Sequence, residues 1–168
     1  MHKIISVSGI IIIIFVIALC LPLTVPRLLG FDSYSIVSGS MEPAIPTGSL
    51  IYSKYGDPAA VEAGDVIAFS NAGMASELTG NADVMAHRVV KNDSGEKQYI
   101  TKGDANDRVD MEPVPYENRI GTVTLHIPLL GYAGAMFATL NGKLGMACAV
   151  IAGLLLNVLG HLLKPEEA

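Results

Sequence analysis

The segment at residues 37–43, VSGSMEP, places Ser38 and Ser40 on either side of a glycine, shortly after a long apolar run. A serine hydroxyl is a weak nucleophile until a base within hydrogen-bond reach accepts its proton. The sequence AHRVV supplies an imidazole at His87, and TKGDANDRVD supplies carboxylates soon after it. Serine, histidine and aspartate together can transfer an acyl group through a covalent intermediate. These residue types indicate nucleophilic hydrolysis as a hypothesis.

Each of these residues also has a purely structural explanation. SGS is a common linker tripeptide, a histidine can be exposed on a strand, and aspartates are frequent in turns. A second histidine, His126, lies in the strand-rich part of the chain. The residues alone leave open how roles divide among Asp104, Asp107 and Asp110.

Five segments in the order SGSMEP, GDVIAF, HRVV, TKGDANDRVD and IGTVTLHIPLLGY, behind an apolar N-terminal run, resemble the type I signal peptidases. The resemblance implies a membrane-bound serine endopeptidase that removes signal peptides from exported preproteins, cutting after small residues through an acyl-enzyme. In the bacterial branch of that family a lysine stands before RVV. This chain has His87 there, so it resembles the archaeal and endoplasmic-reticulum branch, which also reaches some Gram-positive bacteria.

The resemblance also implies roles for single residues. Ser40, directly before Met41, matches the nucleophile, His87 the general base, and Ser38 a group that helps to hold the oxyanion. The apolar residues around Ser40 could line shallow pockets for small substrate side chains, or could pack in the core: Ile36, Val37 and Met41.

The carboxylate beside His87 has two main candidates. Asp110 matches the position that the family would use, and Asp104, in the glycine-aspartate box, is the other. The commoner family pattern GDNN is changed here by Ala105, and Asp107 adds a third acid, so the choice among the aspartates remains open.

Short pieces rich in Val, Ile, Thr and Tyr, broken by Gly, Pro, Asn and Asp, predict a small all-β catalytic domain of short strands. The expected strands are residues 49–55, 65–70, 86–91, 98–102 and 118–128, and residues 71–83 are expected to form a polar loop of low order.

Two uncharged runs, residues 4–21 and 144–163, are each long enough for one helix to cross a bilayer core of about 30 Å. Pro22 and Pro26 are expected to end the first. A cleavable signal peptide, or a lipoprotein site at Cys20, is an alternative for this first run. The expected organisation is an N-terminal anchor, an extracytoplasmic β domain, a C-terminal helix and a tail, at residues 1–24, 25–142, 143–164 and 165–168.

Gly145, Ala149 and Gly153 fall on one face of the second run, which permits close approach of another helix or reflects only the small residues common in membrane helices. Asn157 and His161 are polar within that run. They could form a proton path, a helix contact or a surface contact.

Composition limits the class of protein. Hydrophobic residues make up 51% of the 168 residues and the net charge is −5 without a basic run, which favours membrane segments and gives no sign of nucleic-acid binding. Cys20 and Cys148 lie inside apolar runs, so we expect no disulfide framework, no metal site and no cofactor.

The expected partners are preprotein signal peptides, the lipid bilayer, and accessory subunits or the secretion machinery. Lys3 and Lys164 near the ends suggest that both termini are cytoplasmic, with Arg27, Glu166 and Glu167 weakening that bias. The expected location is a cell membrane or endoplasmic-reticulum membrane, crossed more than once. The competing hypothesis is a membrane-tethered β domain that binds exported segments without cutting them.

Overall fold

The computed structural model describes residues 2–70 and 84–163, in two compact units. One unit holds both ends of the chain, Met1–Val25 with Ala135–Ala168, and the other is Pro26–Gly134. The expected loop at 71–83, Lys164 and the expected tail at 165–168 lie outside the described residues.

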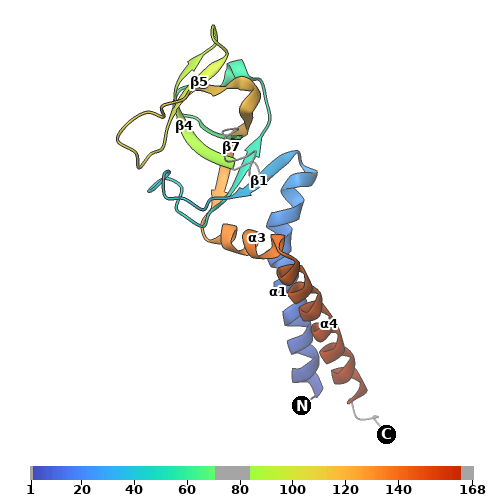
Figure 1. Cartoon of the computed structure of the whole chain (residues 1–168). Helices are drawn as coiled ribbons and strands as arrows, with labels where there is room; N and C mark the ends of the chain where they lie inside the picture. Colours follow the sequence, from blue (N-terminus) through green and yellow to red (C-terminus); the bar gives the residue numbers. More distant parts are fainter. Residues whose placement is uncertain (1, 71–83, 164–168) are drawn as a thin grey trace. The chain divides into compact units, whose positions relative to one another are not determined.

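The middle unit is built on one antiparallel sheet of seven strands in the order β1-β2-β7-β3-β4-β5-β6. This confirms the expected small all-β domain. Figure 1 labels β1, β4, β5 and β7 of this sheet. Two short 3₁₀ helices accompany the strands, η1 (Pro58–Ala60) and η2 (Tyr116–Asn118). The strands are β1 (Phe31–Ser35), β2 (Leu50–Lys54), β3 (Val66–Ser70), β4 (Val84–Asp93), β5 (Gln98–Lys102), β6 (Val114–Pro115) and β7 (Arg119–Ile127).

Alternation along the strands divides the buried side chains into two clusters. In β3, Ile67 and Phe69 belong to one cluster and Ala68, between them, belongs to the other, because successive side chains of a strand point to opposite faces. One cluster contains Ile36, Met41, Ile45, Ile51, Ala68 and Ala86, and the other contains Val61, Ile67, Phe69, Val89, Tyr99 and Val114.

All five expected strands are present, and β1 and β6 were not predicted. The sequence of β1, FDSYS, contains aspartate and serine, which are depleted in strands. It becomes a strand because it pairs with β2 from Phe31 opposite Lys54 to Ser35 opposite Leu50. The short β6 contains Pro115 and lies at the sheet edge, where proline is tolerated.

Helix α1 (His2–Leu28) continues through both prolines, so the expectation that Pro22 and Pro26 end it was wrong. Each proline removes one backbone donor, so only the carbonyl four residues earlier loses its helical partner, and the helix can continue around it. The chain leaves the helix only at Gly30, whose φ of +80° suits glycine.

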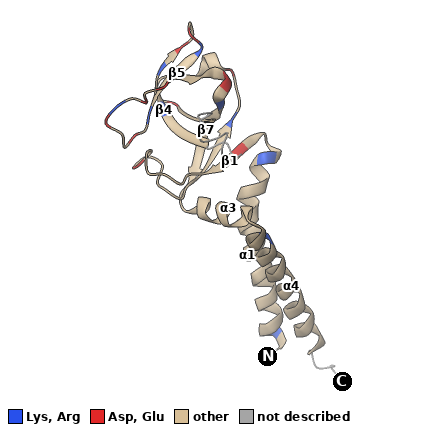
Figure 2. Ribbon diagram, in the orientation of Figure 1, with Lys and Arg blue, Asp and Glu red and all other residues tan. Residues whose placement is uncertain are grey.

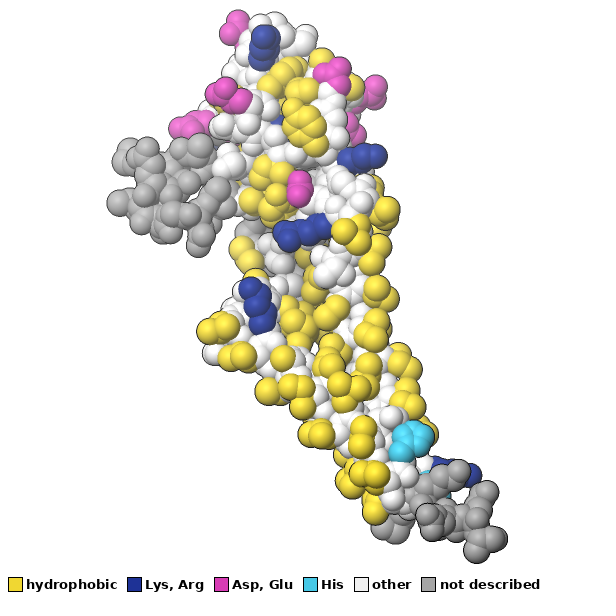
Figure 3. Space-filling model, turned by 90° about the vertical axis from the view of Figure 1, so that its right-hand side faces the viewer, with side chains coloured by type: hydrophobic (Ala, Val, Ile, Leu, Met, Phe, Trp, Pro, Cys, Tyr) yellow, Lys and Arg dark blue, Asp and Glu magenta, His cyan; other side chains and the backbone are white. Residues whose placement is uncertain are grey.

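Helix α4 (Leu140–Leu162) begins at the cap Thr139, whose hydroxyl accepts from the Gly142 amide. A third helix, α3 (Leu130–Ala138), was not predicted. Both α1 and α4 are long and apolar enough to cross a membrane, with mean hydropathies of 3.2 and 1.9. Figure 2 shows the long helices almost entirely in tan, with most of the charged positions on the sheet unit. Figure 3 shows yellow, hydrophobic side chains along the helices.

Helices α1 and α4 pack antiparallel through small residues. A Cβ on Gly9 would lie 2.4 Å from the Gly153 carbonyl oxygen, so glycine is needed for this approach. Asn157 Nδ2 donates to Ser6 Oγ at 3.0 Å. Of the two explanations for the small residues, close approach of another helix thus applies at Gly153, whereas a Cβ on Gly145 would meet open space. Asn157 makes a helix contact, one of the alternatives for this residue.

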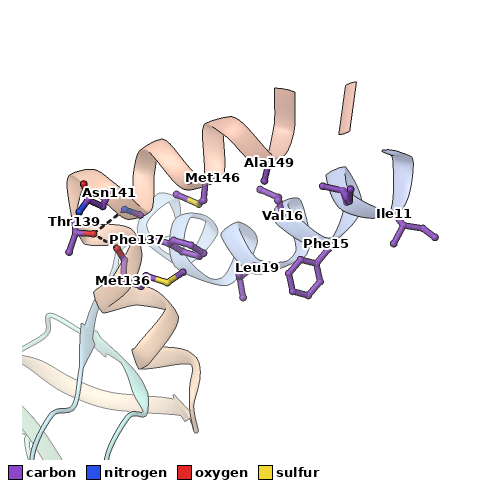
Figure 4. Close-up of a pocket in the computed structure, with 13 residues that line it drawn as sticks. Ile11, Phe15, Val16, Leu19, Met136, Phe137, Thr139, Asn141, Met146 and Ala149 are labelled. Atoms are coloured by element: carbon purple, nitrogen blue, oxygen red, sulfur yellow. Dashed lines mark hydrogen bonds between the residues drawn. The ribbon is translucent and has the colours of Figure 1, made fainter. Parts of the chain in front are cut away.

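A pocket of about 640 Å³ lies between the first turns of α4, the end of α3 and the middle of α1. Figure 4 shows Phe15, Leu19, Phe137 and Met146 along it, with Thr139 and Asn141 at its polar end. Its apolar lining is what two helices surrounded by hydrocarbon would present.

Candidate active site

The segment between β1 and β2 holds Ser40 on a turn that is anchored by buried side chains. Met41 is 1% exposed and Ile45 is 3% exposed, and both belong to a core cluster. Beyond them, Glu42 Oε1 accepts hydrogen bonds from Thr47 Oγ1 at 2.8 Å and from the Thr47 amide at 3.3 Å, which closes the turn. Ser40 therefore sits, partly exposed, on an anchored turn.

His87 lies in β4, where the sheet fixes its position. It pairs with Ile67 of β3, and its side chain is 4% exposed. The Phe69 ring meets the imidazole edge to face, with 6.1 Å between the ring centroids. A buried ring held in this way loses little further freedom when it makes hydrogen bonds.

The two nitrogens of His87 have different partners. Nε2 lies 3.1 Å from Ser40 Oγ, and Nδ1 lies 2.6 Å from Asp110 Oδ2. Since an ionised carboxylate can only accept, Nδ1 carries the proton and donates to Asp110, which leaves Nε2 to accept from the Ser40 hydroxyl. The structure therefore brings three of the candidate residues into one chain of hydrogen bonds.

Ser38 lies beside the nucleophile candidate, with its hydroxyl oxygen 3.3 Å from that of Ser40. The side chain is exposed. A hydroxyl at this place can turn either toward Ser40 or toward an oxygen that develops charge nearby.

Asp104 has a different partner from Asp110. Arg88 Nε donates to Asp104 Oδ1 at 2.8 Å and Arg88 Nη2 donates to Oδ2 at 2.6 Å. These hydrogen bonds lower the pKa of Asp104 below its ordinary value of 3.8 and raise the pKa of Arg88. Arg88 Nη1 also donates to the Gly64 carbonyl at 2.7 Å, so the pair joins β4 to two loops.

The glycine-aspartate box contacts the backbone of Ser40 directly. The Ala105 amide donates to the Ser40 carbonyl at 2.9 Å, and a Cβ on Gly103 would lie 2.6 Å from that same oxygen. The contact uses only the backbone of Ala105, whose side chain is exposed. Asp107 is also exposed, and the hydrogen-bond partners of the His87 ring are Asp110 and Ser40.

A pocket of about 290 Å³ adjoins Ser40. Its lining comes from the segment around Ser40 and from the start of β4, and it includes the three apolar residues that the sequence suggested. The lining residues are Ile36, Val37, Ser38, Ser40, Met41, Val84, Met85 and Ala86.

Sequence reasoning did not assign functions to two residues near the site. Arg88 follows His87, and Thr101 begins the segment TKGDANDRVD, so adjacency to the motifs was the available signal. Thr101 is fully buried, and its hydroxyl donates to Asp110 Oδ2 at 2.7 Å.

A serine, an imidazole and a carboxylate joined by hydrogen bonds on a β domain form the arrangement used by Ser-His-Asp hydrolases. The chain is 31% identical over 137 residues to the signal peptidase complex catalytic subunit SEC11 of Scheffersomyces stipitis, which covers 73% of this chain and 76% of that protein. This chain belongs to the type I signal peptidase family.

Two other relatives agree. The chain is 34% identical to signal peptidase I W of Bacillus subtilis over 64% of its own length, and 33% identical to SEC11 of Clavispora lusitaniae over 58%. It spans 58% and 60% of the lengths of these two relatives. No family profile matches the chain.

Proposed function

We propose that this protein is a membrane-bound serine endopeptidase that removes signal peptides from exported preproteins. The observation that carries the proposal is the hydrogen-bonded series Ser40, His87 and Asp110 in a member of this family. A domain that only binds exported segments is less favoured, because nothing would maintain all three residues in this geometry.

The first step is nucleophilic attack. Ser40 Oγ bonds to the scissile carbonyl carbon while its proton passes to His87 Nε2. Collapse of the tetrahedral intermediate breaks the C–N bond, and the imidazolium gives its proton to the leaving amine of the mature protein. The signal peptide is then held as an ester on Ser40.

The second step returns the enzyme to its starting state. A water molecule gives a proton to His87 and attacks the ester, and Ser40 Oγ leaves with the proton from the imidazolium. Asp110 holds the imidazole with Nδ1 protonated and stabilises the imidazolium in both steps.

The oxyanion would be held by the Ser40 amide and the Ser38 hydroxyl. One such donor is worth roughly 3 kcal/mol in comparable enzymes. Ser38 supports this role because its hydroxyl lies 3.3 Å from the attacking oxygen, and its exposed side chain is among those that line the pocket beside Ser40.

The pocket beside Ser40 is the proposed site for the side chains before the cut. Ala86 and Met41 are among its lining residues, and its volume is about 290 Å³. The preference for small residues at this site is the one that the family resemblance implies, and the partly apolar lining suits side chains such as that of alanine.

The same proposal places α1 and α4 across a membrane and the sheet unit on the extracytoplasmic side, with both termini cytoplasmic. Two apolar helices of sufficient length support it. The name of the SEC11 relatives describes a catalytic subunit of a complex, so accessory subunits are proposed partners here.

The test is cleavage of a preprotein by the purified full-length chain in detergent. Wild type should release a product of mature length, and Ser40→Ala should lose activity by at least about 10³-fold, because only the nucleophile is removed. Ser94→Ala, at an exposed serine in the turn between β4 and β5, is the matched control and should keep full activity. Equal cleavage by Ser40→Ala and wild type would refute the assignment.

A further inference from the structure

We infer that Thr101 is a positioning residue for the proposed reaction: its hydroxyl holds the Asp110 carboxylate in the orientation that binds His87. The inference rests on the proposed function. Thr101 is 0% exposed, and its Oγ1 donates to Asp110 Oδ2 at 2.7 Å. That oxygen is the one that accepts from His87 Nδ1 at 2.6 Å, so a single carboxylate oxygen receives both donors.

The sheet fixes the threonine relative to the histidine. Thr101 of β5 pairs with Val89 of β4, two residues after His87. The donors that meet Asp110 therefore come from adjacent, hydrogen-bonded strands. Threonine is branched at Cβ, which restricts its side-chain torsion and keeps the hydroxyl directed.

Asp110 itself is not on a strand. It lies beyond β5 in the loop before β6, and the preceding residues 105–109 are all exposed. Thr101 holds it at two points, since the Asp110 amide donates to the Thr101 carbonyl at 2.8 Å and the Thr101 hydroxyl donates to the Asp110 carboxylate. The backbone bond places the residue, and the hydroxyl bond sets the rotation of its side chain.

A neutral donor suits the task better than a cation would. Asp104 shows the contrast, because both of its oxygens are paired with the guanidinium of Arg88. A carboxylate paired in that way has its charge balanced and would stabilise an imidazolium weakly. Thr101 orients Asp110 without balancing its charge, which leaves that charge to act on His87.

The competing explanation is that Thr101 contacts Asp110 only because a buried hydroxyl needs a partner. In that case the hydroxyl would contribute to stability and not to turnover. The two explanations differ in what a hydroxyl-free side chain of the same shape does to kcat.

The experiment measures kcat and KM of full-length Thr101→Val, Thr101→Ala and Thr101→Ser on a preprotein in detergent, beside wild type and Ser40→Ala. We expect Thr101→Val and Thr101→Ala to lower kcat about 10- to 100-fold, the value of one charge-assisted hydrogen bond, with KM changed less than about twofold. Thr101→Ser keeps the hydroxyl and should stay within about threefold of wild-type kcat. Thr124→Val is a control for loss of a threonine hydroxyl elsewhere in the sheet: this exposed residue of β7 donates to the Tyr52 carbonyl, and its variant should keep wild-type kcat.

Wild-type kcat in Thr101→Val or Thr101→Ala would overturn the inference, and so would an equal loss in Thr101→Ser, which would point to packing. If Thr101→Val does not fold, the kcat values of Thr101→Ala and Thr101→Ser decide between the two explanations. If the wild type cleaves the preprotein and the Thr101 variants keep its kcat, this inference is refuted while the proposed function stands. A wild type that cleaves no better than Ser40→Ala refutes the proposed function and, with it, the inference.

Discussion

The two aspartates near His87, Asp104 and Asp110, have different hydrogen-bond partners, which indicates different roles. Asp110 meets the imidazole and a hydroxyl, and Asp104 meets the guanidinium of Arg88. An aspartate that keeps its charge available can stabilise imidazolium, whereas one paired with arginine mainly joins the segments that carry the two residues. We therefore propose Asp110 as the residue that orients His87 and Asp104 as a structural residue beside it.

This division predicts unequal effects of the same substitution. Asp110→Asn should lower kcat about 10³- to 10⁴-fold, because an amide cannot hold the imidazole in the required tautomer. Asp104→Asn should keep kcat within about tenfold of wild type, because no reacting group is changed. Cleavage rates of the two purified variants on one preprotein check this, and a larger loss in Asp104→Asn would reverse the assignment.

Asp104→Asn should instead show itself in stability and in its pH dependence. The hydrogen bonds from Arg88 lower the pKa of Asp104 in the folded chain below its ordinary value of 3.8. The pair therefore stabilises the fold at any pH above 3.8, and this stabilisation is lost as the pH falls through the lowered pKa. At neutral pH we expect Asp104→Asn to melt about 2–4 °C lower, for a loss near 1 kcal/mol in a partly exposed pair. The gap between the melting temperatures should close as pH falls below about 4, and a gap that widens in acid would contradict it.

At the scale of elements, helices α1 and α4 are joined by closely packed glycines and one polar contact. Gly9 lies against Gly153, a Cβ on Gly160 would lie 2.6 Å from the Ser6 amide nitrogen, and Asn157 donates to Ser6 Oγ. Apolar surface gives no preference between a helix neighbour and lipid, so close backbone packing and hydrogen bonds must hold such a pair together.

Gly9→Leu should therefore destabilise the helix pair. Its side chain would collide with the Gly153 backbone, and overpacking of this kind typically costs about 1–3 kcal/mol. Gly145→Leu is the matched control, because a Cβ there meets open space. Thermal unfolding in detergent should show a lower midpoint for Gly9→Leu than for Gly145→Leu, and equal midpoints would show that the glycine contact does not hold the helices.

At the scale of the whole molecule, the antiparallel helix pair brings both ends of the chain to one end of the pair. A Cβ on Gly160 would lie 2.8 Å from the His2 carbonyl oxygen, so the first and last described turns are neighbours. If both helices span a bilayer, the two termini must then be on the same side, with the sheet unit between them in sequence on the other.

This geometry predicts the result of digestion of intact cells from outside. Trypsin should cut the sheet unit, for example at the exposed Arg108, and should leave tags at both termini intact. Permeabilised cells are the control, in which both tags should be digested. Loss of the C-terminal tag in intact cells would contradict a topology in which both termini are cytoplasmic.

The sequence by itself determined the parts that depend on local pattern. Two long uncharged runs predicted two apolar helices, short pieces rich in Val, Ile, Thr and Tyr predicted five strands, and the order of the motifs indicated the family. Such signals are local because helix and strand periodicity depends on neighbouring residues. The predicted end of the first helix at Pro22 and Pro26 was wrong, because the tolerance of an apolar helix for proline depends on its surroundings.

Only the tertiary structure decided which aspartate meets His87. Asp104 and Asp110 lie six residues apart in one polar segment, and their residue type cannot distinguish them. The pairing of β4 with β5 brings Arg88 within hydrogen-bond distance of Asp104. It also brings Thr101 close to His87, where the Thr101 hydroxyl donates to Asp110. The weak strand β1 likewise formed only through its pairing with β2. These outcomes depend on contacts between residues far apart in the sequence, which exist only once the sheet has formed.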